Sequence, residues 1–187
     1  IWDDQLIKYG EPIYLARKEF LEDFTPLFQK HYDFISGNKE RVTLEYSSQL
    51  KEASFKDNLL TSREKDRRST YTTTGVHKDD LGFNLGDKLL KKFGSQGQQK
   101  TYLLSLKLAQ AEFLKNNKKI APILLLDDIY DKLDEERVAK LMEVVQKEWF
   151  GQVFISDTHV DRLPNLFDKL GVKYKAFKIE KGRIKDV

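Results

Sequence analysis

Two adjacent carboxylates follow an unbroken apolar run. Residues 123–126 read Ile-Leu-Leu-Leu, and Asp127 and Asp128 come directly after them. A run without alternation predicts a strand buried on both faces of a parallel sheet. In α/β folds, ligands bind at the carboxyl ends of such strands. One carboxylate there can hold Mg²⁺, and the other can orient or deprotonate a water molecule. The dipeptide alone fits equally well a polar strand end in which Asp128 caps a turn.

A second candidate site is the predicted start of a long helix. Ser95, Gln96, Gly97, Gln98 and Gln99 stand at this start, and the helical pattern continues to about residue 116. Free backbone N–H groups and the helix dipole favour an anion at such a position. Gly97 would let a phosphate approach the backbone, and Ser95 can donate its hydroxyl proton. Taken alone, the segment is better explained by an ordinary serine N-cap with a polar first turn.

Two shorter polar segments follow the acidic pair. Asp134, after Leu133, is a good N-cap for a helix that begins at residue 135. Asp157 and His159 follow a second apolar strand, residues 153–155. A histidine at a strand end can contact a phosphate, although a lone surface histidine is the commoner case. Each segment alone indicates no more than a loop or a cap.

The elements that must position these residues can be predicted from periodicity. Residues 11–32 have helical spacing, and Pro26 should kink or break that helix. Residues 42–46 alternate as a half-buried strand, residues 54–68 suit a short helix, and residues 82–93 suit a hairpin or loop. From residue 122 onward the order is strand, helix, strand, helix, strand, which predicts α/β architecture.

Composition excludes several classes of protein. The 187 residues carry a net charge of +3, and 40% are hydrophobic. Because the chain has no cysteine, it has neither a disulfide framework nor thiolate metal sites. No apolar run approaches the roughly 20 residues of a membrane span. A mildly basic balance does not by itself establish nucleic-acid binding. No secretion signal is visible, and the missing initial Met indicates a fragment or a processed piece.

The order and spacing of the motifs resemble the C-terminal half of an ABC-type ATPase head, as in structural-maintenance and Rad50-like proteins. The resemblance implies that residues 95–99 are the signature motif and residues 123–128 the Walker B strand. It assigns Asp127 to metal binding and Asp128 to catalysis. Asp134 becomes the D-loop residue, and His159 the catalytic switch residue, with Asp157 as the alternative for that position.

Further motifs resemble the RecF family. Residues 63–66 read Arg-Glu-Lys-Asp, and Thr72 and the run 75–81, Gly-Val-His-Lys-Asp-Asp-Leu, follow them. RecF proteins usually have Pro where Val76 stands and Arg where Lys78 stands. Lys78 keeps the charge but loses the bidentate geometry of arginine. The resemblance covers nearly the whole chain.

A phosphate-binding P-loop, G-x-x-x-x-G-K-[ST], is absent, because no glycine in this sequence precedes a lysine. The resemblance places it N-terminal to this sequence, so we expect the chain alone neither to bind ATP tightly nor to hydrolyse it. The predicted fold is a partial ABC-type ATPase head with a mainly parallel sheet flanked by helices. Residues 1–119 would form a helical signature lobe. Residues 120–187 would form part of the nucleotide-binding lobe, with an apolar face left open.

The RecF resemblance implies a cytoplasmic protein of DNA replication, recombinational repair and the SOS response. It would be an ATP-dependent, Mg²⁺-dependent dimeric clamp on single-stranded or gapped duplex DNA. It would help to load a recombinase with RecR- or RecO-type mediators. Two alternatives remain. One is a non-enzymatic DNA-binding or scaffold lobe whose acids cap helices. The other is a Mg²⁺-dependent nuclease that uses Asp127, Asp128 and His159.

Overall fold

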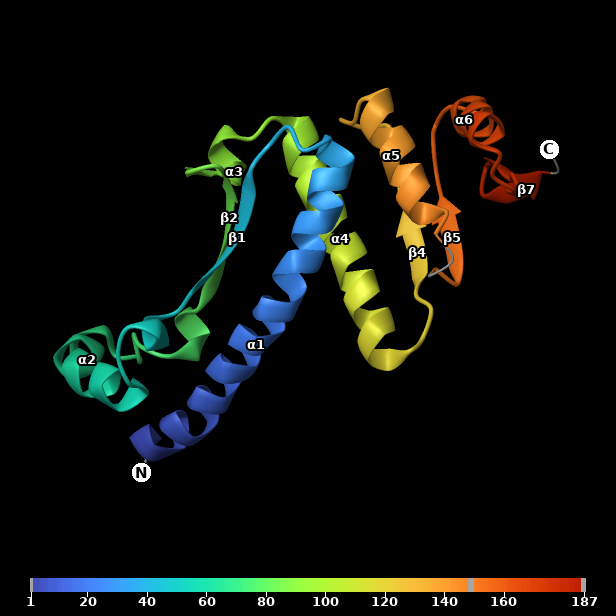
Figure 1. The fold of residues 1–187 in the computed structure, drawn as a ribbon. Helices are drawn as coiled ribbons and strands as arrows, with labels where there is room; N and C mark the ends of the chain where they lie inside the picture. Colours follow the sequence, from blue (N-terminus) through green and yellow to red (C-terminus); the bar gives the residue numbers. More distant parts are fainter. Residues whose placement is uncertain (1, 148–149, 186–187) are drawn as a thin grey trace.

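The computed structural model describes residues 2–147 and 150–185. Two long helices dominate it and lie side by side, with sheets on either side of them (Figure 1). Within the described residues, no helix is both long and apolar enough to cross a membrane.

The first helix is longer than the sequence pattern predicts. α1 (Trp2–Ser36) continues through Pro12 and Pro26, so the expected break at Pro26 does not occur. A proline inside a helix removes one backbone hydrogen bond, and tertiary packing can offset that loss. Such packing is present two residues later, where Phe28 is fully buried and its ring centroid lies 4.6 Å from that of Tyr102.

An antiparallel sheet lies beside this helix pair. Its strands are β1 (Val42–Ser47), β2 (Asp80–Leu85) and β3 (Lys88–Leu89), in that order. The predicted strand at 42–46 and the hairpin after residue 82 are therefore confirmed. The long connection from β1 to β2 contains η1 (Gln49–Lys51), α2 (Phe55–Ser69) and η2 (Val76–Lys78).

From residue 122 onward the remaining elements follow the predicted order of strand, helix, strand, helix and strand, with one further strand at the end. The elements after β3 are α3 (Leu90–Phe93), α4 (Gln96–Lys118), β4 (Ile123–Leu126), α5 (Glu135–Val145), β5 (Gln152–Ile155), α6 (Arg162–Leu170), β6 (Lys178–Glu180) and β7 (Arg183–Lys185). β4 and β5 pair in parallel, which confirms the α/β pattern. The parallel part is limited to this pair among the described residues, since β6 and β7 form an antiparallel hairpin.

Two hydrophobic clusters share α4. One lies between α1, α4 and the antiparallel sheet, and Phe28 and Tyr102 belong to it. The other lies under β4 and β5, and Leu108 of α4 joins it together with Leu141 of α5. Because α4 is buried on both sides, it ties the first part of the chain to the last.

The prediction that β4 is buried on both faces is wrong for this chain. Leu124 and Leu126 are buried, but Ile123 is 61% exposed and Leu125 is 72% exposed. The packed helices cover one face of the strand pair, and no described residue covers the other. Phe154 of β5 is also exposed. The sheet therefore has the open apolar face that we expect from a partial head.

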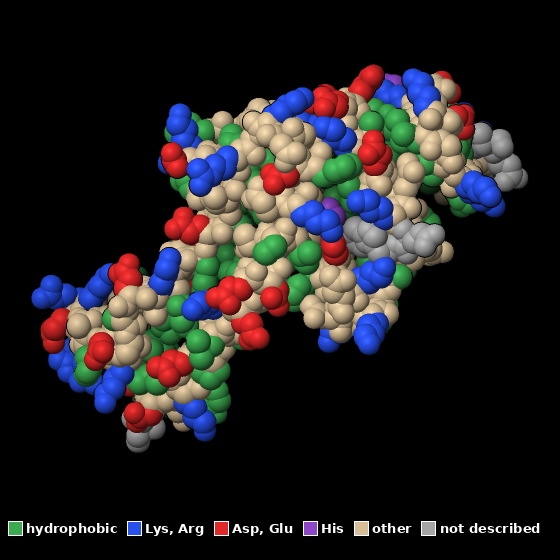
Figure 2. All heavy atoms as spheres, in the orientation of Figure 1, with side chains coloured by type: hydrophobic (Ala, Val, Ile, Leu, Met, Phe, Trp, Pro, Cys, Tyr) green, Lys and Arg blue, Asp and Glu red, His purple; other side chains and the backbone are tan. Residues whose placement is uncertain are grey.

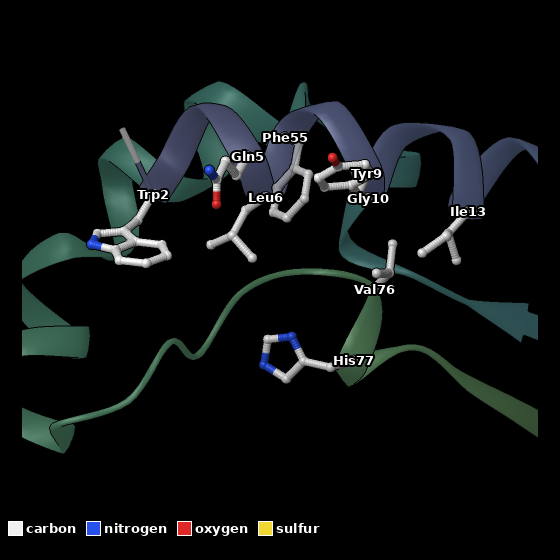
Figure 3. Close-up of a pocket in the computed structure, with 9 residues that line it drawn as sticks. All are labelled: Trp2, Gln5, Leu6, Tyr9, Gly10, Ile13, Phe55, Val76 and His77. Atoms are coloured by element: carbon white, nitrogen blue, oxygen red, sulfur yellow. The ribbon is translucent and has the colours of Figure 1, made fainter.

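A pocket of about 390 Å³ lies beside the N-terminal end of α1 (Figure 3). That end of α1 lies on the other side of the molecule from β4 (Figure 1). The first turns of α1 and the residues around η2 form the pocket, with Trp2, Leu6, Phe55 and His77 in its lining. On the face drawn in Figure 2, basic and acidic side chains are intermixed over the nearby α2 end. This end thus shows no single sign of charge on that face.

Leu108→Ala should lower the free energy of unfolding by about 2–5 kcal/mol, because the side chain is 1% exposed and fills the second cluster. Leu103→Ala is the matched control on the same helix. Leu103 is 53% exposed, so its loss should cost within about 0.5 kcal/mol. Urea titration measures both values. Equal losses in the two variants would contradict the burial described for α4.

Candidate functional site

The acidic pair lies where the sequence predicts, at the carboxyl end of β4. The Ser156 hydroxyl, just past β5, donates to the Asp127 carboxylate, and the Asp128 backbone N–H donates to the same hydroxyl at 3.3 Å. The Ser156 N–H also donates to the Leu126 carbonyl at 2.9 Å. The ends of the two parallel strands are therefore tied together, and Ser156 orients the Asp127 carboxylate.

The two carboxylates differ in setting. Asp127 is exposed, whereas Asp128 is half-buried and has a φ of 45°. That left-handed conformation is uncommon outside glycine and is tolerated better by aspartate than by most residues. Among the described residues, no group of three or more histidines and carboxylates is arranged to hold a metal ion. The exposed Asp127 carboxylate suits Mg²⁺ as one ligand, and phosphate and water oxygens would have to supply the others.

The start of α4 is held by a reciprocal pair of hydrogen bonds. The Gln98 N–H donates to Ser95 Oγ at 3.2 Å, and the Ser95 N–H donates to Gln98 Oε1 at 2.8 Å. This capping box confirms the N-cap interpretation of Ser95. In the same turn, the N–H groups of Gln96 and Gly97 have no hydrogen-bond partner among the described residues. The Gln99 side chain turns back and donates to the Gly94 carbonyl at 2.9 Å.

The missing side chain of Gly97 serves a contact within the chain. A Cβ atom on Gly97 would lie 3.1 Å from the Lys132 carbonyl oxygen, which is tighter than an ordinary contact. The Cα of Gly97 therefore faces protein backbone, and the predicted approach of a phosphate to Gly97 concerns its N–H group and stays a prediction. The Lys100 amine also lies 3.5 Å from the Asp128 carbonyl. Residues 95–99, here called the signature segment, therefore lie directly against the loop that follows the acidic pair.

Asp134 caps α5 as predicted, because its carboxylate accepts the Arg137 N–H at 2.8 Å. The Arg137 side chain then reaches back to the Thr101 hydroxyl of α4 at 2.7 Å and to Glu40 at 2.8 Å. Sequence reasoning missed both Arg137 and Glu40. They are 97 positions apart, and no local pattern in the sequence pairs them.

His159 does not show a contact with the acidic pair. Its ring nitrogen Nδ1 lies 3.1 Å from the Thr158 hydroxyl and 4.0 Å from the Asp157 carboxylate. Asp157 is the buried member of this segment, with its side chain 2% exposed and Oδ2 without a hydrogen-bond partner in the described structure. Ser156 is the residue that reaches Asp127. The role of His159 stays a prediction, and so does the alternative, Asp157.

The electrostatics of Glu40 follow from its partners. Burial alone would raise the pKa of the Glu40 carboxyl, but hydrogen bonds from Tyr32 and Arg137 outweigh burial and hold that pKa below its usual value of 4.5. A carboxyl with a lowered pKa in the folded state stabilises the fold above the unfolded-state pKa. That stabilisation is lost as the pH falls through the folded-state pKa.

Glu40→Gln should therefore make acid destabilisation shallower. The free energy of unfolding of the unchanged chain should fall as the pH drops below 4.5, and the variant should lose less over the same interval. Glu64→Gln, at a largely exposed position on α2, is the control and should follow the unchanged chain. Urea titrations between pH 6 and pH 3 give these values. Parallel curves for Glu40→Gln and the unchanged chain would contradict the charged pair.

Comparison with known proteins gives consistent relatives, although no family model matches the chain. The DNA replication and repair protein RecF of Flavobacterium johnsoniae is 50% identical over 179 residues, which are 96% of this chain and 50% of that protein. RecF of Bacteroides thetaiotaomicron is 44% identical over 187 residues, which are 100% of this chain and 51% of that protein.

Solved structures agree with these relatives. A structure described as the recombination mediator protein RecF-ATP in the RecFOR pathway matches 99% of this chain and 49% of that chain, with a TM-score of 0.73 and 27% identity. A second, described as RecF-ATPrS, matches 97% and 48%, with a TM-score of 0.71 and the same identity. The partial ABC-type ATPase head predicted from sequence is thereby confirmed. Over nearly its whole length this chain is similar to RecF proteins, and it spans about half the length of the RecF proteins that it matches.

Proposed function

We propose that this chain forms the signature and Walker B part of an ATP-dependent DNA clamp of RecF type. One observation carries the proposal: the donor-rich start of α4 lies against the loop that follows the acidic end of β4, where the Lys132 carbonyl approaches Gly97 and the Lys100 amine lies 3.5 Å from the Asp128 carbonyl. In this proposal residues 1–119 are the signature lobe and residues 120–187 belong to the nucleotide-binding lobe, with α4 packed into both.

The proposed mechanism uses two copies. ATP would be bound at a P-loop of one copy, in the half of a RecF protein that this chain does not match. The signature segment of the other copy would face the γ-phosphate. Its Gln96 and Gly97 amides and the Ser95 hydroxyl would neutralise the charge there. Because these donors would reach the phosphate only when two copies meet, ATP would act as a switch for dimerisation.

The acidic pair would act beside the P-loop of its own copy. Asp127 would help to hold Mg²⁺, which would balance the phosphate charge. Asp128 would orient the attacking water and accept its proton. Asp134 would approach the dimer interface, and His159 would contact the γ-phosphate. Hydrolysis would then remove the charge that holds the two copies together.

Dissociation of the two copies after ATP hydrolysis suits a protein that binds DNA for a limited time. We propose single-stranded or gapped duplex DNA as the partner, bound mainly through its phosphates and therefore sensitive to salt. Recombination mediators of the RecR or RecO type would be the protein partners, in the cytoplasm. The mixed charges over the α2 end in Figure 2 do not favour that surface as the main DNA contact.

The experiments need both halves of a RecF protein. A hybrid supplies them, in which this chain replaces the matching half of the Flavobacterium johnsoniae relative, 50% identical to it. The unchanged hybrid should dimerise with ATP and Mg²⁺ and hydrolyse ATP. The alternative of a non-enzymatic scaffold, which the capping roles of Ser95 and Asp134 also fit, predicts no response of the hybrid to ATP.

Asp128→Asn in the hybrid should lower the rate of ATP hydrolysis by at least about 100-fold, because a general base contributes on that scale. ATP-driven dimerisation should persist, since the amide keeps the size of the side chain. Steady-state phosphate release and analytical ultracentrifugation measure the two effects. Asp87→Asn, in the exposed β2–β3 turn, is the control and should change neither. Unchanged hydrolysis in Asp128→Asn would disprove the catalytic role.

Ser95→Arg should weaken ATP-driven dimerisation by at least about tenfold, because the large side chain fills the space proposed for the γ-phosphate. Nucleotide binding to each copy should not change, since the P-loop lies elsewhere. Ser95→Asp tests the same contact with the helix cap preserved: aspartate can still accept the Gln98 N–H, but it repels phosphate.

Ser47→Arg, at the exposed end of β1, is the matched control for both variants. Sedimentation with ATP gives the dimerisation constants, and fluorescence titration with a labelled nucleotide gives the affinity of the single copy. Normal dimerisation of both Ser95 variants would show that the signature segment does not contact nucleotide across the interface.

A further inference from the structure

One arginine joins the elements that the proposed function assigns to the dimer interface. The Arg137 guanidinium donates through Nη1 to the Thr101 hydroxyl at 2.7 Å and to the Gly97 carbonyl at 3.3 Å. Its Nε lies 3.4 Å from the Asp134 carboxylate. The same side chain therefore contacts the first turns of α4 and the residue that begins α5.

Glu40 completes this arrangement from the loop between α1 and β1. It accepts Arg137 Nη2 at 2.8 Å, and both side chains are only 15% exposed. The other Glu40 oxygen accepts the Tyr32 hydroxyl, and Tyr32 is fully buried. Glu40 is thus fixed by the core and in turn fixes the guanidinium.

We propose that Arg137, seated by Glu40, is a positioning residue that holds the signature segment and the turn 131–134 in one fixed arrangement. The effect of this positioning on dimerisation rests on the proposed function. There, both segments of one copy would have to meet the nucleotide that is bound by the other copy. Arg137 itself does not contact that nucleotide. It acts by keeping the Gly97 backbone and Asp134 at a constant separation before two copies meet.

The geometry requires an arginine. A guanidinium offers five donors in a planar fork, so it can serve the hydroxyl, the carbonyl and Glu40 at once. A lysine keeps the charge but has a single, compact donor group, and it would leave at least one of these acceptors unpaired. A buried network that is only partly satisfied loses much of its rigidity. Arg137→Lys is therefore the informative substitution, since it changes the geometry and keeps the charge.

The first experiment uses the 187-residue chain and amide hydrogen exchange. Arg137→Lys should raise the exchange rates of the hydrogen-bonded amides in two segments, residues 98–101 and residues 131–138, by about tenfold, because the link between them opens locally. Amides around residue 28 of α1, in the other cluster, should keep their rates. Lys140→Ala is the control: Lys140 lies on α5 but pairs with Glu136 at 2.9 Å. It should leave both segments unchanged.

A double variant distinguishes a positioning role of Arg137 from a general contribution to the stability of the fold. Glu40→Gln should raise the exchange rates of the same two segments, and the double variant with Arg137→Lys should raise them no further, because the two residues act as one unit. If Arg137→Lys speeds exchange equally throughout the chain, the residue is merely structural and the inference is wrong. The inference also fails if neither segment changes.

The second experiment uses the hybrid. Arg137→Lys should raise the dissociation constant of the ATP-dependent dimer by about tenfold and leave nucleotide binding to the single copy unchanged. If the unchanged hybrid dimerises and the variant dimerises equally well, the inference is overturned. If the unchanged hybrid does not dimerise with ATP, the proposed function fails, and the exchange experiment then decides whether Arg137 links the two segments.

Discussion

The burial of α4 on two sides is the constraint on which the rest of this structure depends. One side packs against α1 through aromatic rings such as Phe28 and Tyr102, and the other enters the cluster under β4 and β5 through Leu108. A helix held in this way cannot rotate without opening both clusters. Its first turn is therefore presented at a fixed place, where the Lys132 carbonyl fits against Gly97. The relation of the signature segment to the acidic pair follows from that packing.

Local signals predicted much of the fold and of the site. The N-cap at Ser95, the cap at Asp134 and the apolar run before Asp127 each depend on residues within a few positions of one another. Such patterns can be read from a sequence because the physical cause is local. The pairing of β4 with β5 followed from the alternation of strands and helices in the same region.

The features that the sequence did not reveal depend on distant contacts. α1 continues through Pro26 because neighbouring rings pack against α4, which no helical pattern within α1 indicates. Leu125 belongs to a run typical of a fully buried strand, yet its face is open, because burial depends on what covers the strand. Arg137 looks like an ordinary charged residue in a first helical turn. Its role depends on Glu40, which only the fold brings within 2.8 Å.

These contacts give the proposed switch its physical basis. Donors that are rigid before the ligand arrives need not reorganise when charge must be neutralised. α4, the capping box and the Arg137–Glu40 pair supply that rigidity within one copy. The charge to be neutralised would arrive with the other copy. In the proposed function, a fixed half-site that is complete only across an interface would make association depend on the nucleotide. Hydrolysis of that nucleotide would then reverse association.

The central claim is that the signature segment contacts nucleotide held by the other copy. Photo-crosslinking tests it directly, with an ATP analogue that carries a photoreactive group on its γ-phosphate. An unlabelled hybrid is mixed with a ¹⁵N-labelled hybrid whose P-loop lysine is replaced by alanine, so that only the unlabelled copy binds the analogue. We predict cross-links on the ¹⁵N-labelled peptide that contains residues 95–99. Cross-links confined to the unlabelled copy would contradict the shared site.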